Sequence, residues 1–128
     1  MRINLPSASS AIVVPGVEFA GHKSVVQVNM ILDTGAGYTL IDSMTAETLG
    51  YNLRAPHKRV TIVTANGRIH APLIHVRKIS IGNIFIKDIP VICHDIPGIV
   101  EASGLLGLNF LRHFRTVIDY RKFTLEIL

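Results

Sequence analysis

The chain of 128 residues is long enough for one domain with its own hydrophobic core, so it does not need disulfides for stability. Hydrophobic residues make up 48% of it, but no apolar run reaches the length of a membrane helix, about 18 residues, and we expect a soluble protein without a membrane partner. The single cysteine, Cys93, excludes an intrachain disulfide, and the formal net charge of +4 makes a nucleic-acid surface only a minor alternative.

The N-terminal residues contain no continuous hydrophobic segment of signal-peptide length. A lone cysteine fits a reducing compartment or a thiol that is merely buried, and with the missing signal segment we expect a cytoplasmic protein. Residues 1–10 could form a flexible N-terminal segment of a single domain that spans residues 1–128. The first expected strand, Ala11–Ala20, is interrupted by Pro15 and Gly16, which predicts an edge strand or a β-bulge.

The second expected strand, Ser24–Leu32, ends at the most informative residue of the chain. Its apolar residues alternate with Gln27 and Asn29, and this period of two places one face in a core and brings Asp33 to the strand end. A carboxylate at the end of a buried strand is costly unless it is paired or used in chemistry. Asp33 is therefore the leading catalytic candidate.

The rest of the chain has the pattern of short strands separated by turns, which predicts an all-β barrel or sandwich. A short helix capped by Asp42 or Ser43 is expected to continue through Leu49. Asn66 and Gly67 are the strongest hairpin signal. The other expected elements are the strands Val60–Ala65, Arg68–Val76, Lys78–Ile81 and Ile84–Cys93, the helix Leu108–Phe114 and a final hairpin within Thr116–Leu128.

Three features follow one another along the chain. Asp33-Thr34-Gly35 comes after an apolar strand, the Asn66-Gly67 hairpin comes next, and Gly104-Leu105-Leu106-Gly107 precedes a short helix. This order resembles the retropepsin family, the homodimeric aspartic peptidases of retroviral type, and is most similar to their cellular and bacterial relatives. The resemblance implies a small closed β-barrel with one or two short helices, a homodimer and aspartic endopeptidase activity.

The resemblance further implies that Asp33 acts with Asp33 of a second copy, because the chain has one Asp-Thr-Gly sequence. Two carboxylates that share a proton supply the acid and the base that peptide hydrolysis needs, with neither a metal nor another cofactor. In the family the Thr34 hydroxyl reaches across the two-fold axis, and Gly35 permits the sharp turn. Ala36 and Gly37 would line the cleft for a protein or peptide substrate.

The Asn66-Gly67 hairpin matches the position of the family's flap, which closes over an extended peptide and excludes water. An ordinary hairpin with a type I′ turn is the structural alternative. The expected flap-tip residues are Thr64, Ala65, Asn66, Gly67 and Arg68. Leu105 and Leu106 resemble the apolar pair that packs behind the catalytic loop in the family, and Gly107 resembles the glycine that permits close passage of the chain.

The chain departs from the retroviral pattern at Gly37 and Leu108, where retroviral enzymes usually have an acidic residue and an arginine that pair to brace the dimer. Because both are absent together, no charge is left unpaired, and we expect the dimer to be braced differently. In retroviral enzymes the two termini interleave in an interface sheet. The terminal strand Thr124–Leu128 could do the same, or it could close a hairpin within its own chain.

Other functions have less support in the sequence. A catalytically inactive dimeric module that binds peptides is the main alternative, since a fold alone does not determine function. The basic residues around Arg54 and Arg59 lack an interleaved aromatic platform, so no nucleic-acid partner is expected. No set of His, Cys and acidic residues has metal-ligand spacing, and we expect no metal site. Asp119 is expected in a hairpin turn, because no Thr-Gly follows it.

Overall fold

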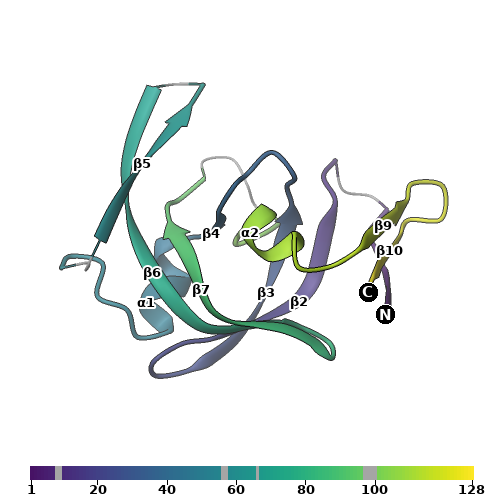
Figure 1. Cartoon of the computed structure of the whole chain (residues 1–128), viewed down its shortest axis with the longest axis horizontal. Helices are drawn as coiled ribbons and strands as arrows, with labels where there is room; N and C mark the ends of the chain where they lie inside the picture. The colour runs from purple at the N-terminus through teal and green to yellow at the C-terminus, as the bar shows by residue number, and fades with distance from the viewer. Residues whose placement is uncertain (8–9, 56–57, 66, 97–100) are drawn as a thin grey trace.

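The computed structural model describes residues 1–7, 10–55, 58–65, 67–96 and 101–128 (Figure 1). Its strands belong to a barrel and to a small terminal sheet beside it. The barrel strands are β2 (Val13–Ala20), β3 (Val25–Leu32), β4 (Thr39–Ile41), β6 (Gly67–Ile81), β7 (Ile84–Cys93) and β8 (Gly104–Leu106). The other elements are β1 (Arg2–Asn4), β5 (Lys58–Thr64), β9 (Thr116–Asp119), β10 (Thr124–Ile127), α1 (Ser43–Thr48) and α2 (Leu108–Leu111).

The barrel closes because β6 pairs with strands on both of its sides. The sheet runs in the order β2-β3-β8-β4-β7-β6, and the C-terminal part of β6 returns to β2, with Phe19 opposite Ile79. Within this sheet β8 lies parallel to β3 and antiparallel to β4. β5 pairs with the N-terminal part of β6, and the two strands extend from the barrel as a hairpin (Figure 1). The expected all-β fold with a closed barrel is confirmed.

The strand that leads to the catalytic candidate forms as the sequence predicts. β3 ends at Leu32, and its inward-facing residues Met30 and Leu32 are buried. The partner strand β2 changes register at Pro15 and Gly16, where Gly16 has a φ of +66° that favours glycine. The expected β-bulge is therefore confirmed.

Two expected strands, Arg68–Val76 and Lys78–Ile81, are one continuous strand of 15 residues, β6. The buried positions change phase between Val76 and Ile79, so the sequence pattern predicts a break there. The backbone pairing with β7 nevertheless keeps one register across this point. The pairing omits Arg77 and Asp88, whose φ is +52°, and resumes at Lys78 opposite Lys87, so β6 continues through this point.

The two helices are short. α1 has the expected cap, because Oδ1 of Asp42 accepts a hydrogen bond from the N–H of Thr45 at 2.7 Å. α2 ends at Leu111 and not at Phe114, because the N–H groups of His113 and Phe114 donate to carbonyls three residues earlier and tighten the last turn. Among the described residues, no helix is long and apolar enough to cross a membrane.

The terminal sheet is built within one chain in the order β1-β10-β9. Its central strand, β10, pairs antiparallel with β1 on one side and with β9 on the other. Arg2–Asn4 therefore form a paired strand within residues 1–10, the segment expected as possibly flexible; residues 8 and 9 lie outside the described part of the chain. The physical reason is that β1 satisfies backbone groups that β10 would otherwise leave unpaired.

The main hydrophobic core fills the barrel and continues under the terminal sheet. Phe19, Met30 and Phe110 are completely buried in it, and so is Leu125 of β10. The terminal sheet is therefore packed on the barrel. A second, smaller cluster of buried residues consists of Leu40, Ala71, Leu73 and Ile92.

Gly104 of β8 lies so close to β4 that a Cβ there would overlap the carbonyl oxygen of Leu40. We expect Gly104→Ala to lower the free energy of unfolding by about 3 kcal/mol, since the clash is with backbone. Urea unfolding followed by circular dichroism measures this. Gly37→Ala is the control, because a Cβ at Gly37 would meet nothing within 4 Å; equal losses in both variants would contradict the assignment.

Candidate active site

Asp33 begins the loop that joins β3 to β4, and this loop folds back on it. The N–H of Gly35 donates to Oδ1 of Asp33 at 2.8 Å, and the N–H of Ala36 donates to the carbonyl oxygen of Asp33 at 3.3 Å. The Asp33 side chain is half-buried, and its other oxygen, Oδ2, has no hydrogen bond to another described residue. One carboxylate oxygen is thus oriented by the loop, while the other remains available to a ligand.

The other predicted residues of this loop differ in their exposure. Thr34, Gly35 and Gly37 are exposed, and Ala36 is half-buried. A Cβ at Gly35 would lie 3.2 Å from Oδ1 of Asp33, which is tighter than an ordinary contact. Glycine at this position therefore lets the loop approach the carboxylate closely.

The second predicted motif lies directly against the Asp33 loop. The N–H of Asp33 donates to the carbonyl oxygen of Leu106 at 3.0 Å, and the N–H of Leu108 donates to the carbonyl oxygen of Ala36 at 2.8 Å. The N–H of Asn109 donates to the carbonyl oxygen of Gly37 at 3.0 Å. Residues far apart in the sequence are thereby joined by backbone hydrogen bonds, and the position of Asp33 depends on both segments.

Gly107 makes this close approach possible. A Cβ at Gly107 would lie 2.5 Å from the carbonyl oxygen of Tyr38, so a larger residue would push the two segments apart. Of the preceding apolar pair, Leu106 is completely buried in the main core. Leu105 is half-buried and packs against the second cluster. The two leucines therefore support the loop from different faces of β8.

A buried polar network, which the sequence analysis missed, braces the same contact. Oδ1 of Asn109 accepts from the N–H and the hydroxyl of Thr39 at 2.8 and 2.9 Å, and Nδ2 of Asn109 donates to the carbonyl oxygen of Pro90 at 2.7 Å. The Thr39 hydroxyl also accepts from the N–H of Gly107 at 3.1 Å. Thr39 is completely buried, so these bonds satisfy groups that would otherwise be costly.

The sequence contains only a weak signal for this network. Asn109 lies in a short helical stretch, where asparagine is a poor helix former. Thr39 is the first residue of β4, and the other residues of this strand are aliphatic. Neither residue by itself indicates a hydrogen-bond network. The two side chains meet only in the folded chain, across 70 positions of sequence.

The predicted flap corresponds to the β5–β6 hairpin, with one difference at its tip. Thr64 lies opposite Gly67, so the turn begins one residue earlier than an Asn66-Gly67 turn would require. This register places Ile62 directly opposite Ile69, and cross-strand pairs of β-branched residues stabilise a hairpin. Asn66 itself lies outside the described residues.

Side chains of the hairpin pack on the same apolar cluster as Leu105 of the second motif. The partly buried residues packed on the second cluster are Val60, Ile62, Ile69, Ile96 and Leu105. At the tip, Ala65, Gly67 and Arg68 are exposed. The structure thus joins the hairpin, β4 and β8 through one apolar cluster that is separate from the main core.

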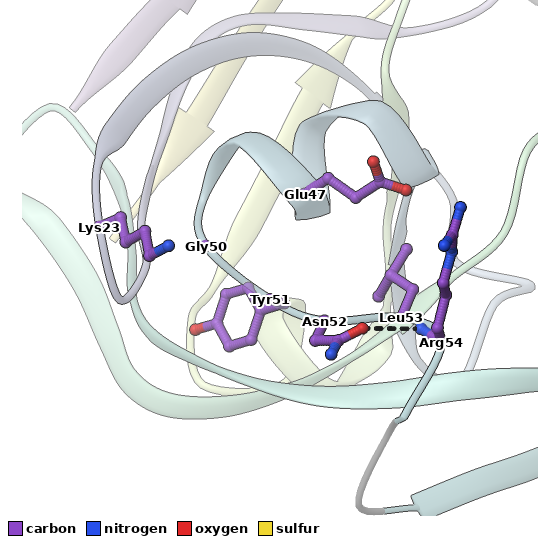
Figure 2. A pocket seen from close by; sticks show the side chains of 7 residues that line it. All are labelled: Lys23, Glu47, Gly50, Tyr51, Asn52, Leu53 and Arg54. Carbon is purple, nitrogen blue, oxygen red and sulfur yellow. Dashed lines mark hydrogen bonds between the residues drawn. The ribbon is translucent and has the colours of Figure 1, made fainter.

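A cavity of about 380 Å³ lies between α1 and the segment that follows it (Figure 2). In Figure 2, Glu47 projects from α1, and the N–H of Arg54 donates to Oδ1 of Asn52 at 3.1 Å. The lining residues are Lys23, Glu47, Gly50, Tyr51, Asn52, Leu53 and Arg54. None of them belongs to the Asp33 loop or to the second motif, so this cavity is not part of the candidate active site.

Two buried titratable groups lie outside the Asp33 loop. Burial raises the pKa of the Cys93 thiol to about 12, so the thiol stays protonated and unreactive at neutral pH. Burial also raises the pKa of Tyr51, whose hydroxyl donates to the carbonyl oxygen of His75 at 2.7 Å. In the described part of the chain, no three His, Cys, Asp or Glu side chains are grouped so as to hold a metal ion.

We expect Asn109→Ala to lower the free energy of unfolding by about 2 to 3 kcal/mol, because it leaves the buried hydroxyl and N–H of Thr39 without their acceptor. Thermal or urea unfolding measures this loss. The matched control is Asn29→Ala, which truncates an exposed asparagine of β3. An Asn109→Ala variant as stable as the control would show that the network contributes nothing to the fold.

Comparisons with known proteins place the chain among aspartic proteases. Residues 17–113 match the family described as "gag-polyprotein putative aspartyl protease". The uncharacterized protein in the cobV 5'region of Sinorhizobium sp is 34% identical over 89 residues, which cover 66% of this chain and 35% of that protein. The chain thus spans about a third of the length of this curated relative.

The fold is also shared with a protein of known structure. The crystal structure of a retropepsin-like aspartic protease from Rickettsia conorii matches with a TM-score of 0.71 and 24% sequence identity, covering 100% of this chain and 98% of that chain. This likeness concerns the fold, and the family match covers most of the chain. The chain therefore belongs to the retropepsin-like aspartyl protease family, as the order of its motifs predicts.

Proposed function

We propose that this chain is an aspartic endopeptidase that acts as a homodimer, with one Asp33 from each copy. The observation that carries the proposal is the geometry of the Asp33 loop, in which the Gly35 N–H orients a half-buried carboxylate at the end of β3. One chain has a single Asp-Thr-Gly sequence. Because aspartate-catalysed hydrolysis uses two carboxylates, the second must come from another copy.

The two Asp33 carboxylates would share one proton, since like charges a few ångströms apart do not both ionise easily. The ionised carboxylate takes a proton from water, and the water oxygen attacks the scissile carbonyl carbon while the protonated carboxylate donates to the carbonyl oxygen. The first carboxylate then protonates the leaving nitrogen as the C–N bond breaks. A hydroxyl of the tetrahedral intermediate returns a proton to the second carboxylate, which restores the starting state.

The remaining residues of the loop would position the Asp33 carboxylate, the partner loop and the substrate. Gly35 holds one carboxylate oxygen through its N–H, and the absence of a side chain leaves space beside that oxygen. The Thr34 hydroxyl has no hydrogen bond to another described residue and would bond to the partner loop. Ala36 and Gly37 would form the floor of the substrate cleft.

The β5–β6 hairpin would close over an extended peptide. Its tip residues Ala65, Gly67 and Arg68 are exposed, and we propose that they, together with Thr64 and Asn66, contact the substrate. A closed hairpin excludes water, which strengthens the electrostatic interactions of the catalytic pair.

The second cluster provides an apolar wall for this cleft. Leu105 lies in β8, opposite Ile31 of β3, and it packs on the same cluster as Ile62 and Ile69 of the hairpin. All three side chains are only partly buried in the single chain. We infer that they accept apolar side chains of the substrate next to the scissile bond.

Peptides with apolar residues on both sides of the scissile bond should be cleaved faster than peptides with charged residues there. Leu105→Ala should lower kcat/KM for the apolar peptide by about tenfold, because it removes apolar contact with the substrate. Met44→Ala is the control, since Met44 is 78% exposed on α1. Equal kcat/KM values for both variants would show that Leu105 does not contact the substrate.

Asp33→Asn should lower kcat by about 10² to 10⁴ fold while the protein stays folded, because the amide can neither accept the proton of water nor share one. Cleavage of an unstructured protein, followed by mass spectrometry, measures the loss. The matched control is Asp88→Asn, which makes the same chemical change at an exposed position where a positive φ suits asparagine.

The Asp33→Asn variant and the wild type together separate the two functions that the sequence allows. Full cleavage by Asp33→Asn would disprove the catalytic pair. A wild-type protein that binds extended peptides and cleaves none of them would instead be the non-catalytic peptide-binding module.

A further inference from the structure

We propose that two copies of this chain join edge to edge along β9, so that their terminal sheets form one continuous sheet in the order β1-β10-β9-β9-β10-β1. This inference rests on the proposed function, which requires a second Asp33. It goes further, because it names the strand, the register and the charge pairs that hold the two copies together.

The topology restricts where a second copy can add a strand. β10 pairs with β1 on one side and with β9 on the other within one chain. Neither side of β10 is therefore open to a strand of a second copy, and the termini cannot interleave through it. The strands left at the edges of this sheet are β1 and β9.

The hydrogen-bond alternation shows which groups β9 presents at its outer edge. Arg115 and Leu128 exchange both backbone hydrogen bonds at 2.9 Å, which makes them a hydrogen-bonded pair of the ladder. Because such pairs alternate in an antiparallel ladder, the N–H and C=O groups of Thr116 and Ile118 point away from β10. An edge strand with unpaired backbone groups is a template for another strand.

The two edges of the sheet are not equivalent. β1 has three residues, carries the exposed Arg2 in an ion pair with Glu126 at 3.6 Å, and is soon followed by Pro6. Charge, short length and proline all discourage edge pairing. β9 instead carries Val117, which is 41% exposed at its middle, and exposed Tyr120 follows the strand. We therefore place the second copy on β9.

The strand length sets the register. A two-fold axis through Val117 places Thr116 opposite Ile118 of the partner subunit and uses the whole strand. Axes through Thr116 or Ile118 would form hydrogen-bonded pairs with Phe114 or Tyr120, which lie outside the ladder that Arg115 and β9 form with β10. The axis through Val117 forms two hydrogen-bonded pairs with the outward-facing backbone groups, so both copies use their edges fully.

The same register produces charge complementarity. Arg115 lies opposite Asp119 of the partner subunit, and the two-fold axis repeats this pair. Asp119 already accepts from the N–H groups of Arg121 and Lys122 at 3.0 and 2.9 Å, but both bonds use Oδ1. Oδ2 has no hydrogen bond to another described residue, so it can accept from the guanidinium of the partner's Arg115.

A cysteine at the two-fold axis tests the register directly. Val117 would face Val117 of the partner subunit in a non-hydrogen-bonded pair with Cα atoms about 4.5 Å apart, which is within the range for a disulfide. Val117→Cys should therefore form a covalent dimer under mild oxidation. Asn4→Cys, on the outer edge of β1, is the matched control and should stay mostly monomeric on a non-reducing gel. Cys93 is buried and does not compete.

Charge reversal tests the ion pairs. Arg115→Asp would place the new carboxylate against Asp119 of the other copy twice, and the dissociation constant of the dimer should rise at least about tenfold at low salt. Arg121→Asp makes the same charge change in the exposed turn after β9 and should leave that constant unchanged. Sedimentation of both variants, with circular dichroism to verify folding, gives the two values.

The β9 interface and the peptidase activity can be disproved independently of each other. Cross-linking of Val117→Cys no faster than Asn4→Cys, or equal dimer affinity of the Arg115→Asp and Arg121→Asp variants, would overturn the β9 interface even if the wild type cleaves peptides. A wild type that remains monomeric would overturn it as well. Covalent Val117→Cys dimers together with a weakened Arg115→Asp dimer would support the interface even if no peptide is cleaved, and then the proposed activity alone would fall.

Discussion

The structure depends on the close approach between the Asp33 loop and the segment that follows β8. The backbone hydrogen bond from Asp33 to Leu106, and those from Leu108 and Asn109 back to the loop, fix the end of β3 against a strand from the other half of the chain. Gly107 is required there because a Cβ would collide with the backbone of the loop. The position of the carboxylate is therefore set by long-range contacts, and rigid strands hold it more accurately than a free loop could.

The side chains that brace this close approach carry no charge. Retroviral relatives usually place an ion pair at the positions of Gly37 and Leu108, whereas here Thr39 and Asn109 form a buried network of uncharged hydrogen bonds. A neutral pair avoids the cost of burying two charges, and the N–H and hydroxyl of Thr39 and the side-chain oxygen of Asn109 all have partners within one chain. The loop thus holds its shape before any second copy arrives, so the missing charges need not weaken the candidate site.

The terminal sheet changes how a dimer can be built. Because β10 is already paired on both sides, it supports its own barrel through Leu125 and Ile127, and a second copy would have to add its strand at an edge of this sheet. A dimer formed from such preassembled sheets requires no strand exchange. Folding of each copy and association of the two are then separate steps, whereas interleaved termini would couple them.

The sequence by itself determined the elements whose signals are local. The period of two in β3, the bulge at Pro15 and Gly16 and the cap at Asp42 each depend on neighbouring residues, and the order of the three motifs was enough to identify the family. Local pattern failed where a strand changed its buried face, at Val76 in β6, and where pairing fixed the hairpin register at Thr64 and Gly67. Only the tertiary structure decided the Thr39–Asn109 network, the pairing of β1 and the free edge of β9, because each depends on residues distant in sequence that come together when the barrel closes.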